Sequence, residues 1–338
     1  MNIGDATADF HRLNLVGSSA TFRGAIELMR KYAASDATVL LHGETGTGKE
    51  LAARAIHYLG PRRDRPFVPV NCGALPDSLV ESEFFGHVRG AFTDARESRE
   101  GLIRQAQGGT LYLDEVEAMT PRAQVTLLRF LQDKDYRPVG GETVRHVDVR
   151  VVGSTNADLR AMSRQGAFRS DLLFRLDVLP LRLPPLRERR GDVAVLAQAF
   201  LDRLNRRSDA PPTTLDPLSA PILDAHGWPG NVRELENLIQ REYVLSAGTR
   251  VIRITGIHAD EEAPAVERGD EEDFTRAKAR VVARFEKRYL TDLMARTAGN
   301  VSLAARIAGK DRSDINRLLR KHGIHRGLFA EGAEGARP

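Results

Sequence analysis

One stretch, Leu40–Glu50, constrains the fold more than any other part of this chain. It predicts a short apolar strand (Thr38–Leu41), a glycine-rich loop, and a helix that opens at Lys49. A strand that turns through glycines into a helix start presents backbone N–H groups and a positive dipole end to an anion. The lysine then reaches the outer phosphates of a nucleotide. Strand and helix both lie where this mechanism needs them, so the stretch predicts nucleotide binding rather than a plain glycine turn.

The residue after this lysine is Glu50, where phosphate loops usually place a serine or threonine that holds magnesium. A second acidic element must therefore contribute more to binding the metal. Gly108–Glu115 has the pattern of a buried strand that ends in Asp114 and Glu115. In phosphate-loop ATPases an aspartate at this place holds Mg²⁺, and a following glutamate can orient the attacking water as a general base. We therefore predict these two roles for Asp114 and Glu115, rather than two solvated acids at a strand end.

Composition narrows the class of protein. The chain has 338 residues, of which 41% are hydrophobic, as expected for a soluble globular protein of two or three domains. No apolar run is long enough to span a bilayer, and Met1–Phe10 lacks the features of a secretory signal. The single cysteine, Cys72, is expected to be a small core residue. These features predict a cytoplasmic location and no membrane partner.

The net charge of +4 does not by itself indicate nucleic acid, but the distribution of charge is informative. Two acidic runs, Asp260–Glu262 and Asp270–Asp273, precede a segment in which basic residues return. Charge blocks of this kind are typical of solvated linkers. We therefore predict an acidic linker over residues 257–273.

Alternating strands and helices predict an α/β fold over residues 11–188, with a parallel sheet covered on both faces. Ligands gather at the carboxyl ends of the strands in such sheets. From Asp192 to Ala247 helical patterns take over, which predicts a helical subdomain over residues 189–256. Helical patterns return after the linker, in a domain over residues 274–326, and residues 327–338 are predicted to be a disordered tail. The strands are expected at Thr38–Leu41, Pro66–Asn71, Gly108–Glu115, Val147–Ser154 and Asp177–Leu183, and the helices at Ala20–Ala34, Glu50–Leu59, Leu75–Phe85 and Pro121–Gln132.

Together these motifs resemble the AAA+ activators of the sigma-54 form of bacterial RNA polymerase, also called bacterial enhancer-binding proteins. The resemblance covers Val16–Ile324 and includes the family's own phosphate loop, whose glutamate accounts for Glu50. It implies a three-layer P-loop NTPase core with a helical lid, and ATP and Mg²⁺ as cofactors. The nucleotide-binding residues that it implies are Gly43, Glu44, Thr45, Gly46, Thr47, Gly48, Lys49, Glu50, Asn156 and Arg233.

The resemblance also implies catalytic roles. Asn71 matches the asparagine thought to hold the catalytic glutamate, here Glu115, out of position until a partner is engaged. Phe168–Leu176 matches the segment with two arginine fingers, Arg169 and Arg175. A finger supplied by a neighbouring subunit is worth on the order of 10³–10⁵ in rate in GTPases. The alternative for these arginines is a pair of surface salt bridges.

Phe85–Ala95 resembles the family's loop carrying Gly-Ala-Phe-Thr-Gly-Ala, which contacts the sigma factor. Small residues around one exposed aromatic ring make a mobile loop with a single apolar anchor. Asp94 stands where the family has glycine, and aspartate tolerates a positive φ less well and adds a negative charge. A working contact, an altered sigma surface and an impaired loop all stay open. The predicted sigma-54 contacts are Gly90, Ala91, Phe92, Thr93, Asp94 and Ala95.

The C-terminal part predicts a helix-turn-helix. Gly299–Gly309 starts a compact helix with small residues, and Asp311 or Ser313 could cap the basic helix that follows. The pair resembles the Fis-type DNA-binding domain of the family, and a generic helical hairpin is the alternative. Phe274–Ala295 would form the preceding dimer helices, so two-fold related half-sites in double-stranded DNA are expected. The predicted DNA contacts are Arg312, Ser313, Asn316, Arg317, Arg320 and Lys321.

These features predict an ATP-hydrolysing activator that assembles into a ring, binds upstream DNA and converts closed sigma-54 promoter complexes to open ones. The residues before Val16 are too few for a receiver domain, so control in trans by a separate regulator protein or by abundance is expected. One alternative is a DNA-binding AAA+ regulator that has lost sigma-54 contact. Asp94, which replaces the glycine of the family's loop, is the feature that supports this alternative. A second rival is an AAA+ remodeller of another protein.

Overall fold

The computed structural model describes residues 13–92, 95–208, 211–246, 249–254, 256–257, 286, 289–291, 293–294, 297 and 299–324. The chain divides into two compact units, residues 1–257 and 258–338. Within the described residues, no helix is long and apolar enough to cross a membrane.

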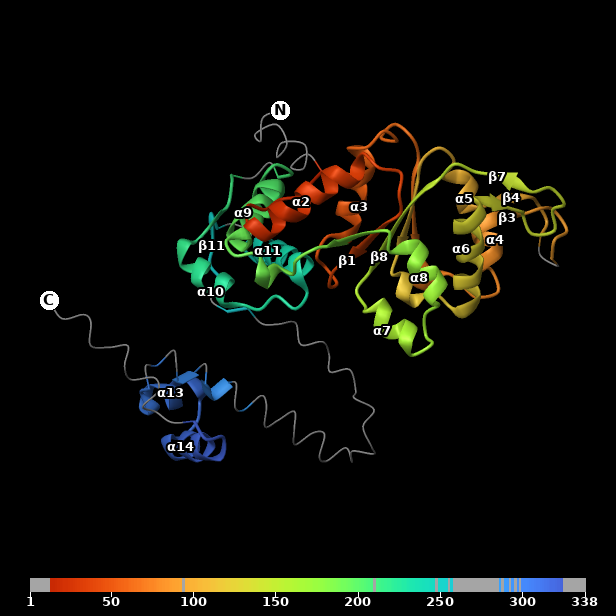
Figure 1. The fold of residues 1–338 in the computed structure, drawn as a ribbon. Coiled ribbons are helices and arrows are strands. Elements are labelled where there is room, and N and C mark those ends of the chain that lie inside the picture. Colours follow the sequence, from red (N-terminus) through yellow and green to blue (C-terminus); the bar gives the residue numbers. More distant parts are fainter. Residues whose placement is uncertain are drawn as a thin grey trace. The chain divides into compact units, whose positions relative to one another are not determined.

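A parallel sheet of five strands forms the centre of the first unit (Figure 1). Its spatial order is β2-β5-β8-β1-β9, so β1 lies between the two strands that come last in the sequence. All carboxyl ends therefore meet at one edge, and the predicted parallel α/β sheet is confirmed. The strands are β1 (Val39–His42), β2 (Phe67–Asn71), β5 (Thr110–Asp114), β8 (Arg150–Thr155) and β9 (Leu179–Arg182).

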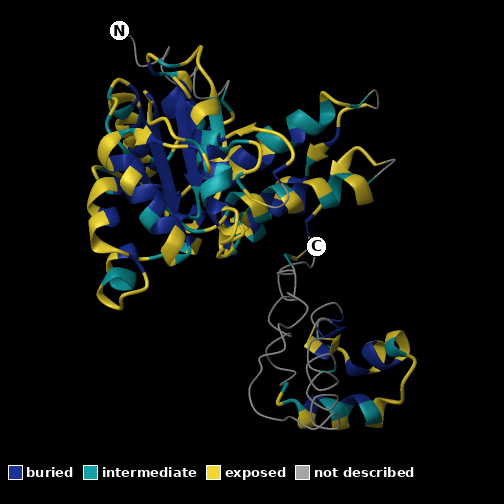
Figure 2. Ribbon diagram, turned by 90° about the vertical axis from the view of Figure 1, so that its right-hand side faces the viewer, coloured by how far each residue is buried: buried dark blue, intermediate teal, exposed yellow. Residues whose placement is uncertain are grey.

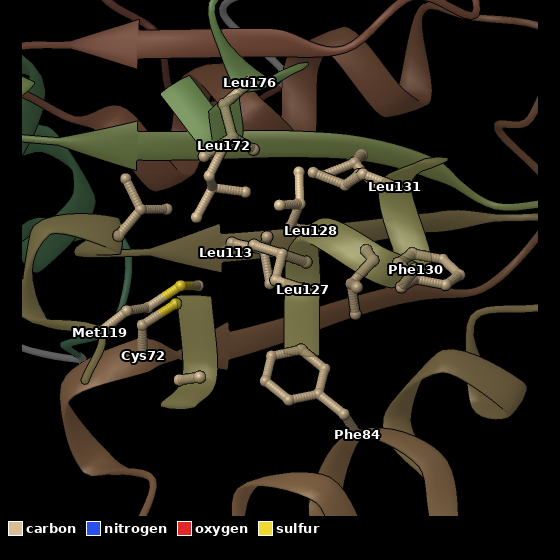
Figure 3. Close-up of a cluster of buried hydrophobic side chains, with 14 of the residues drawn as sticks. Cys72, Phe84, Leu113, Met119, Leu127, Leu128, Phe130, Leu131, Leu172 and Leu176 are labelled. Atoms are coloured by element: carbon tan, nitrogen blue, oxygen red, sulfur yellow. The ribbon is translucent and has the colours of Figure 1, made fainter. Parts of the chain in front are cut away.

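Helices cover both faces of this sheet, because two separate apolar clusters form on its two sides. On one face α2 (Ala20–Ala33) and α3 (Lys49–Tyr58) bury Met29 and Ile56 against β1. On the other face Phe84, Leu127 and Leu172 pack with Leu113 of the sheet (Figure 3). The helices of this second face are α4 (Val80–Phe85), α5 (Leu102–Gln105), α6 (Pro121–Asp133), α7 (Leu159–Arg164) and α8 (Ser170–Leu176).

Burial separates the two kinds of element clearly. The central strands are buried along their length, whereas the helices expose their outer faces (Figure 2). Cys72 lies in the second-face cluster beside Met119, as the sequence predicts for a small core residue (Figure 3). Burial raises the pKa of its thiol, first through desolvation and then through nearby acids.

Three predicted elements are clearly shorter than expected, and one of them is the strand predicted at Asp177–Leu183, which is β9 (Leu179–Arg182) in the structure. The helix predicted over Leu75–Phe85 begins only at Val80, because Pro76 keeps Leu75 in an extended conformation with ψ 116°. The strand predicted from Val147 begins at Arg150, since the Val147 N–H donates to the carbonyl oxygen of Lys134 at 3.0 Å and so leaves the sheet ladder.

Two short hairpins interrupt the α/β alternation and were not predicted. The first pairs β3 (Gly86–His87) with β4 (Arg99–Glu100), and the second pairs β6 (Asp135–Tyr136) with β7 (Arg145–His146). The strands have only two residues each, which is too short for periodicity to reveal them.

The rest of the first unit is mainly helical and has its own apolar core around Trp228. Its helices are α9 (Asp192–Asn205), α10 (Ala220–Ala225) and α11 (Asn231–Leu245). A parallel pair, β10 (Thr214–Leu215) and β11 (Val251–Ile252), also belongs to it, although only helices were predicted there. The short 3₁₀ helix η3 (Leu186–Glu188) leads into this lid from the sheet.

In the second unit α13 (Val301–Ala308) and α14 (Arg312–Lys321) pack around a small apolar core that includes Ile315 and Leu319. Asn300 caps α13 by accepting from Ser302 and Leu303 N–H, and Gly309 ends the helix at φ +61°. Asp311 stands at the N-cap position of α14, but its side chain makes no capping hydrogen bond. Most of the predicted preceding helices (Phe274–Ala295) and the predicted tail lie outside the described residues.

Candidate nucleotide-binding site

The glycine loop connects β1 to α3 at the carboxyl edge of the sheet. Gly46 (φ +79°) and Gly48 (φ +95°) occupy the left-handed region, which lets the chain turn sharply into the helix at Lys49. Lys49 Nζ donates to the carbonyl oxygens of Gly43 (2.8 Å) and Glu44 (3.2 Å). Burial lowers the pKa of Lys49, while nearby acids oppose that shift. The lysine is therefore held over its own loop, inside a cluster of opposite charge.

The acidic end of β5 lies at the same edge of the sheet as this loop, with β8 between β5 and β1. The Tyr112 hydroxyl donates to Asp114 Oδ1 at 2.9 Å, and the Ser154 hydroxyl of β8 donates to the same oxygen. No described residue donates a hydrogen bond to the second oxygen. Asp114 is thus fixed in orientation through one oxygen. Sequence reasoning did not identify Tyr112 and Ser154 as its supports.

Glu115 has an unusual backbone conformation, with φ 57° and ψ 54° in the left-handed region. Such conformations are costly for a residue with a side chain and cluster at functional sites. The Asn71 side-chain oxygen accepts from the N–H groups of Gly73 (2.9 Å) and Ala74 (3.1 Å). No hydrogen bond joins Asn71 to Glu115 among the described residues. Both side chains flank Gly73, where an added Cβ would lie 3.4 Å from Asn71 Oδ1 and 3.9 Å from Glu115 Oε2.

Asn156 follows β8 and reaches the loop, since its Nδ2 donates to Thr45 Oγ1 at 3.2 Å. Its backbone N–H donates to Glu117 Oε1 at 3.1 Å. The other oxygen of Glu117 is buried and has no partner among the described residues. Glu117 is one of the acids whose charge acts on Lys49. Sequence reasoning missed this residue, although its place two positions after Glu115 was a usable signal.

The lid supplies further side chains on the opposite side of the loop. Arg187 donates to both carboxylate oxygens of Glu44, at 2.7 and 2.5 Å. Hydrogen bonds from Arg187 first, and then from Asn231, lower the pKa of Glu44 to about 2. Arg233, in the first turn of α11, lies close to Gly46, and its charge contributes to the lowered pKa of Lys49. Arg187 and Asn231 were not predicted as part of the site.

Two other loop residues have local roles. The Thr47 hydroxyl donates to Glu44 O at 2.8 Å, inside the loop. Glu50 accepts from Arg54 one turn later in α3, at 2.7 and 3.0 Å, and the pair is largely exposed. The role of Glu50 in nucleotide binding stays a prediction, since its described bonds are only to Arg54.

The predicted arginine fingers stand apart from this cluster, on α8. Arg169 forms a two-pronged ion pair with Asp171, at 3.0 and 2.8 Å, which raises the pKa of Arg169. Arg175 is exposed and has no hydrogen-bond or ion-pair partner within the described part of the chain. Phe174 beside it has 79% of its surface exposed. Neither arginine bonds to the phosphate loop of its own chain.

The loop around Phe92 is closed by backbone bonds. Gly90 N–H donates to Ala95 O at 2.8 Å, and Ala95 N–H donates to Phe92 O at 3.0 Å. Ala95 is buried, whereas Phe92 is 37% exposed with its ring 4.9 Å from that of His87. Gly140 lies against Ala91, since an added Cβ would come within 2.8 Å of it. Thr93 and Asp94 lie outside the described residues.

In the second unit the predicted DNA contacts lie on α14. Arg317 bonds to Asp314 at 2.7 Å, and Lys321 bonds to Glu286 at 2.7 Å. Asn316 is half-buried. The remaining positions, Arg312, Ser313 and Arg320, are exposed.

The sheet order, the glycine loop and the lid together define an AAA+ nucleotide-binding domain. Residues 15–182 match the model of the sigma-54 interaction domain, and residues 187–272 match that of the AAA+ ATPase lid domain. The chain therefore belongs to the family of sigma-54-dependent transcriptional activators and carries the ATPase domain of that family.

Named relatives agree with this assignment. Regulatory protein AtoC of Escherichia coli is 42% identical over 304 residues, which cover 87% of this chain and 64% of AtoC. Transcriptional regulatory protein GlrR of Escherichia coli is 39% identical over 328 residues, covering 96% of this chain and 72% of GlrR. The crystal structure of NtrX from Brucella abortus in complex with ATP has a TM-score of 0.66 at 33% identity, covering 92% of this chain and 69% of NtrX. The chain spans 48% to 64% of the length of several relatives that it matches.

Proposed function

We propose that this chain hydrolyses ATP to activate transcription by the sigma-54 form of RNA polymerase. The observation that carries the proposal is the meeting of Lys49, Asp114, Glu115 and Asn156 at one edge of the sheet, beside the lid residue Arg233. A lysine for phosphates, an acid for a metal, and a second acid for water are the parts that phosphoryl transfer to water needs.

The residues present fit ATP with Mg²⁺. Magnesium is usually bound through one or two carboxylates together with substrate phosphates, and Asp114 presents one carboxylate oxygen that no described residue bonds. The described residues contain no cluster of three or more His, Cys, Asp or Glu side chains suited to a metal. Phosphate oxygens would therefore complete the metal's ligands. Bound Mg²⁺ supplies positive charge against the charge that develops on the transferred phosphoryl group.

The chain's own residues take the remaining steps. Lys49 binds the outer phosphates, and Asn156 holds the loop side chain of Thr45 near them. Glu115 accepts a proton from the attacking water as the new P–O bond forms and the bond to the departing ADP breaks. Asn71, which flanks Gly73 with Glu115, restrains that carboxylate until a partner engages.

A neighbouring subunit is proposed to complete the site. Arg175 is exposed and bonds to no other described residue, so it is available to a second copy, and Arg169 is available once it leaves Asp171. A ring, expected to be a hexamer, places one subunit's α8 against the next subunit's nucleotide. Phe92, which is partly exposed, then contacts sigma-54, so that a movement of its loop driven by ATP hydrolysis acts on the sigma factor.

The second unit is proposed to bind two-fold symmetric DNA upstream of a promoter. The basic helix α14 would enter the major groove, as the second helix of a helix-turn-helix does. Its exposed Arg312 and Arg320 are available for phosphate or base contacts.

Trapping with sigma-54 tests this function. Purified chain would be mixed with isolated sigma-54 and ADP with an aluminium or beryllium fluoride, beside an Asp94→Gly variant. We expect a stable complex with the unaltered chain. A complex with the glycine variant alone would identify Asp94 as an attenuator. If neither chain is trapped while ATP is still hydrolysed, sigma-54 is not the target, and a DNA-binding regulator without sigma-54 contact takes its place.

A further inference from the structure

Glu44 is committed to protein contacts rather than open to a ligand. Its carboxylate accepts from both terminal nitrogens of Arg187, at 2.7 and 2.5 Å, and from Asn231 Nδ2 at 3.2 Å. Two-pronged pairs of this kind fix geometry as well as charge. The contacts cross from the phosphate loop to two separate lid segments, η3 and the start of α11. Glu44 thus joins three parts of the molecule that are 143 and 187 positions apart in sequence.

Asn231 is the buried centre of this network. Its side chain is fully buried, and its backbone lies in the left-handed region at φ +53°. Its Oδ1 accepts from Leu186 N–H at 2.8 Å, while its Nδ2 also donates to Thr45 O at 3.0 Å. One amide therefore holds the lid entrance and the phosphate loop together. A strained backbone persists only where its surroundings demand it, which here means these bonds.

The backbone continues the same connection at the next residues. Val232 N–H donates to Gly46 O at 3.0 Å. Gly46 and Gly230 approach so closely that a Cβ at Gly46 would lie 2.2 Å from Gly230 O. Three successive loop residues, 44 to 46, are thus each bonded to the lid. The shape of the phosphate loop is not set by the loop alone.

Arg233 follows directly in α11 and is exposed with no bonded partner in the described residues. Its Cβ lies 3.2 Å from the position of a Cβ at Gly46, and its charge reaches Lys49. Two cations side by side repel each other, so something must hold the second one in place. The bonds of Glu44 and Asn231 fix the start of α11, the helix that carries Arg233.

We propose that Glu44, Arg187 and Asn231 form a latch that positions Arg233 beside Lys49, so that Glu44 is a positioning residue and not a nucleotide ligand. This inference rests on the proposed nucleotide site. Without the latch the lid keeps its backbone bond from Val232 to Gly46 but loses its side-chain bonds to the loop, so Arg233 is held less firmly near the phosphates. The latch therefore sets nucleotide affinity through the lid.

Nucleotide titration of the full chain tests the latch. The variants are Glu44→Gln, Arg187→Gln and the double variant, and the matched control is Arg190→Gln, an exposed arginine three positions further along the same hinge that bonds to no described residue. We expect each latch variant to weaken ATP and ADP binding about two- to fivefold, because the Glu44–Arg187 pair is partly exposed, and the double variant to be no weaker than either single one. Arg190→Gln is expected to bind as the unaltered chain does. Adding Arg233→Ala to the Glu44→Gln variant should weaken nucleotide binding little further than Glu44→Gln alone.

A second readout separates positioning from loss of fold. Trp228 is the only tryptophan, and it is buried in the lid three positions before Asn231. We expect acrylamide to quench its fluorescence more in the latch variants than in Arg190→Gln, with unchanged thermal unfolding midpoints. If a variant unfolds, Arg187→Lys, which keeps the charge and loses the two-pronged geometry, is expected to give an intermediate affinity.

Three outcomes overturn the latch. They are unchanged binding in Glu44→Gln, losses that multiply in the double variant as two separate ligands would give, and an Arg233→Ala effect undiminished by Glu44→Gln. Failure of the unaltered chain to bind ATP would instead refute the proposed nucleotide site itself.

Discussion

Two regions at opposite ends of this comparison, the phosphate loop and the helix α8, differ in whether their polar side chains have bonded partners. At the phosphate loop Lys49, Asp114 and Asn156 each bond to other residues of the same chain. On α8, Arg175 and Phe174 face solvent without a bonded partner in the described residues. Folding alone organises the first end, so it needs no second molecule to take its shape. We interpret the second end as a surface that a neighbouring subunit completes.

The largest effect on ATP hydrolysis is expected from removing the exposed cation of Arg175. Arg175→Ala is predicted to lower the ATPase rate of the assembled protein by on the order of 10³–10⁵, because a finger stabilises charge in the transition state. Nucleotide binding by the isolated chain should not change, since Arg175 does not bond to its own loop. Steady-state hydrolysis and a binding titration measure the two.

A mixture of two variants, Arg175→Ala and Glu115→Gln, sharpens this test. The first variant still has Glu115 and the second still has Arg175. If the finger acts between subunits, mixing the two inactive variants restores hydrolysis at the mixed interfaces. No recovery, in a mixture shown to co-assemble, would contradict the interpretation of α8.

The next effect concerns the organised end. Glu115→Gln is predicted to reduce hydrolysis by on the order of 10²–10⁴, the contribution of a positioned general base. ATP should still bind, because Lys49 and Asp114 are unaltered. Single-turnover hydrolysis and ATP titration distinguish the two steps. A variant that loses binding as well would show that Glu115 shapes the site rather than acts on water.

A third prediction concerns stability at the lid hinge, where the chain passes from the sheet into the lid. Arg189 and Asp192 form an ion pair at 2.9 Å, with side-chain exposures of 2% and 0%. Asp192 also accepts from Ser18 and Ser19 N–H, at 2.6 and 2.8 Å. Removing one partner of such a buried pair costs about 3–5 kcal/mol. Asp192→Ala should lower the free energy of unfolding by about that much in urea denaturation, whereas a change under about 1 kcal/mol, typical of exposed pairs, would contradict the structure.

Acid should weaken the same pair. Burial by itself raises the pKa of Asp192, but hydrogen bonds from Ser18, Arg189 and Ser19 outweigh it and hold the pKa below its usual value of 3.8. The stabilisation is therefore full above about pH 4 and is lost as the pH falls through the lower pKa of the folded state. Between pH 5 and pH 3, the free energy of unfolding should fall less steeply in an Asp192→Asn variant than in the unaltered chain.

The smallest effect comes from a buried histidine behind the phosphate loop. His57 Nδ1 lies 2.9 Å from Thr110 Oγ1, and burial lowers the pKa of His57 below its usual 6.5. The folded state therefore favours the neutral ring, and stability is full above pH 6.5 and is lost as the pH falls below it. The loss cannot exceed about 1.4 kcal/mol per pH unit. A His57→Gln variant should show a flatter dependence between pH 7 and pH 5, and equal slopes would contradict a buried neutral ring.

Local patterns predicted the sheet and the phosphate loop well. The run of apolar residues before Gly43 and the glycines after it appear in the structure as β1, the loop and the start of α3. The helix over Leu75–Phe85 was predicted too long, although Pro76 gave the local reason for its late start. The hairpins β3–β4 and β6–β7 were not visible, since two-residue strands are held by pairing between distant segments.

The predicted site residues divide in the same way. Lys49, Asp114 and Glu115 are recognisable from motifs because backbone geometry carries their positions. Glu117 and Asn231 were missed, since neither lies at a motif position predicted to touch the nucleotide. Glu44 was predicted as a nucleotide ligand, and its bonds to Arg187 point to a different role. Contacts across 143 positions leave no periodic trace in a sequence.

The sequence by itself determined the fold class, the nucleotide loop and the family, because each depends on short runs whose residue types follow from local backbone geometry. Only the tertiary structure decided which polar groups are already bonded and which stand free. It showed Glu44 bonded to the lid, Glu117 with a buried unpartnered oxygen, and Arg175 without a bonded partner in the described residues. The physical reason is that a hydrogen bond depends on distance in space, and folding brings together residues that the sequence keeps far apart.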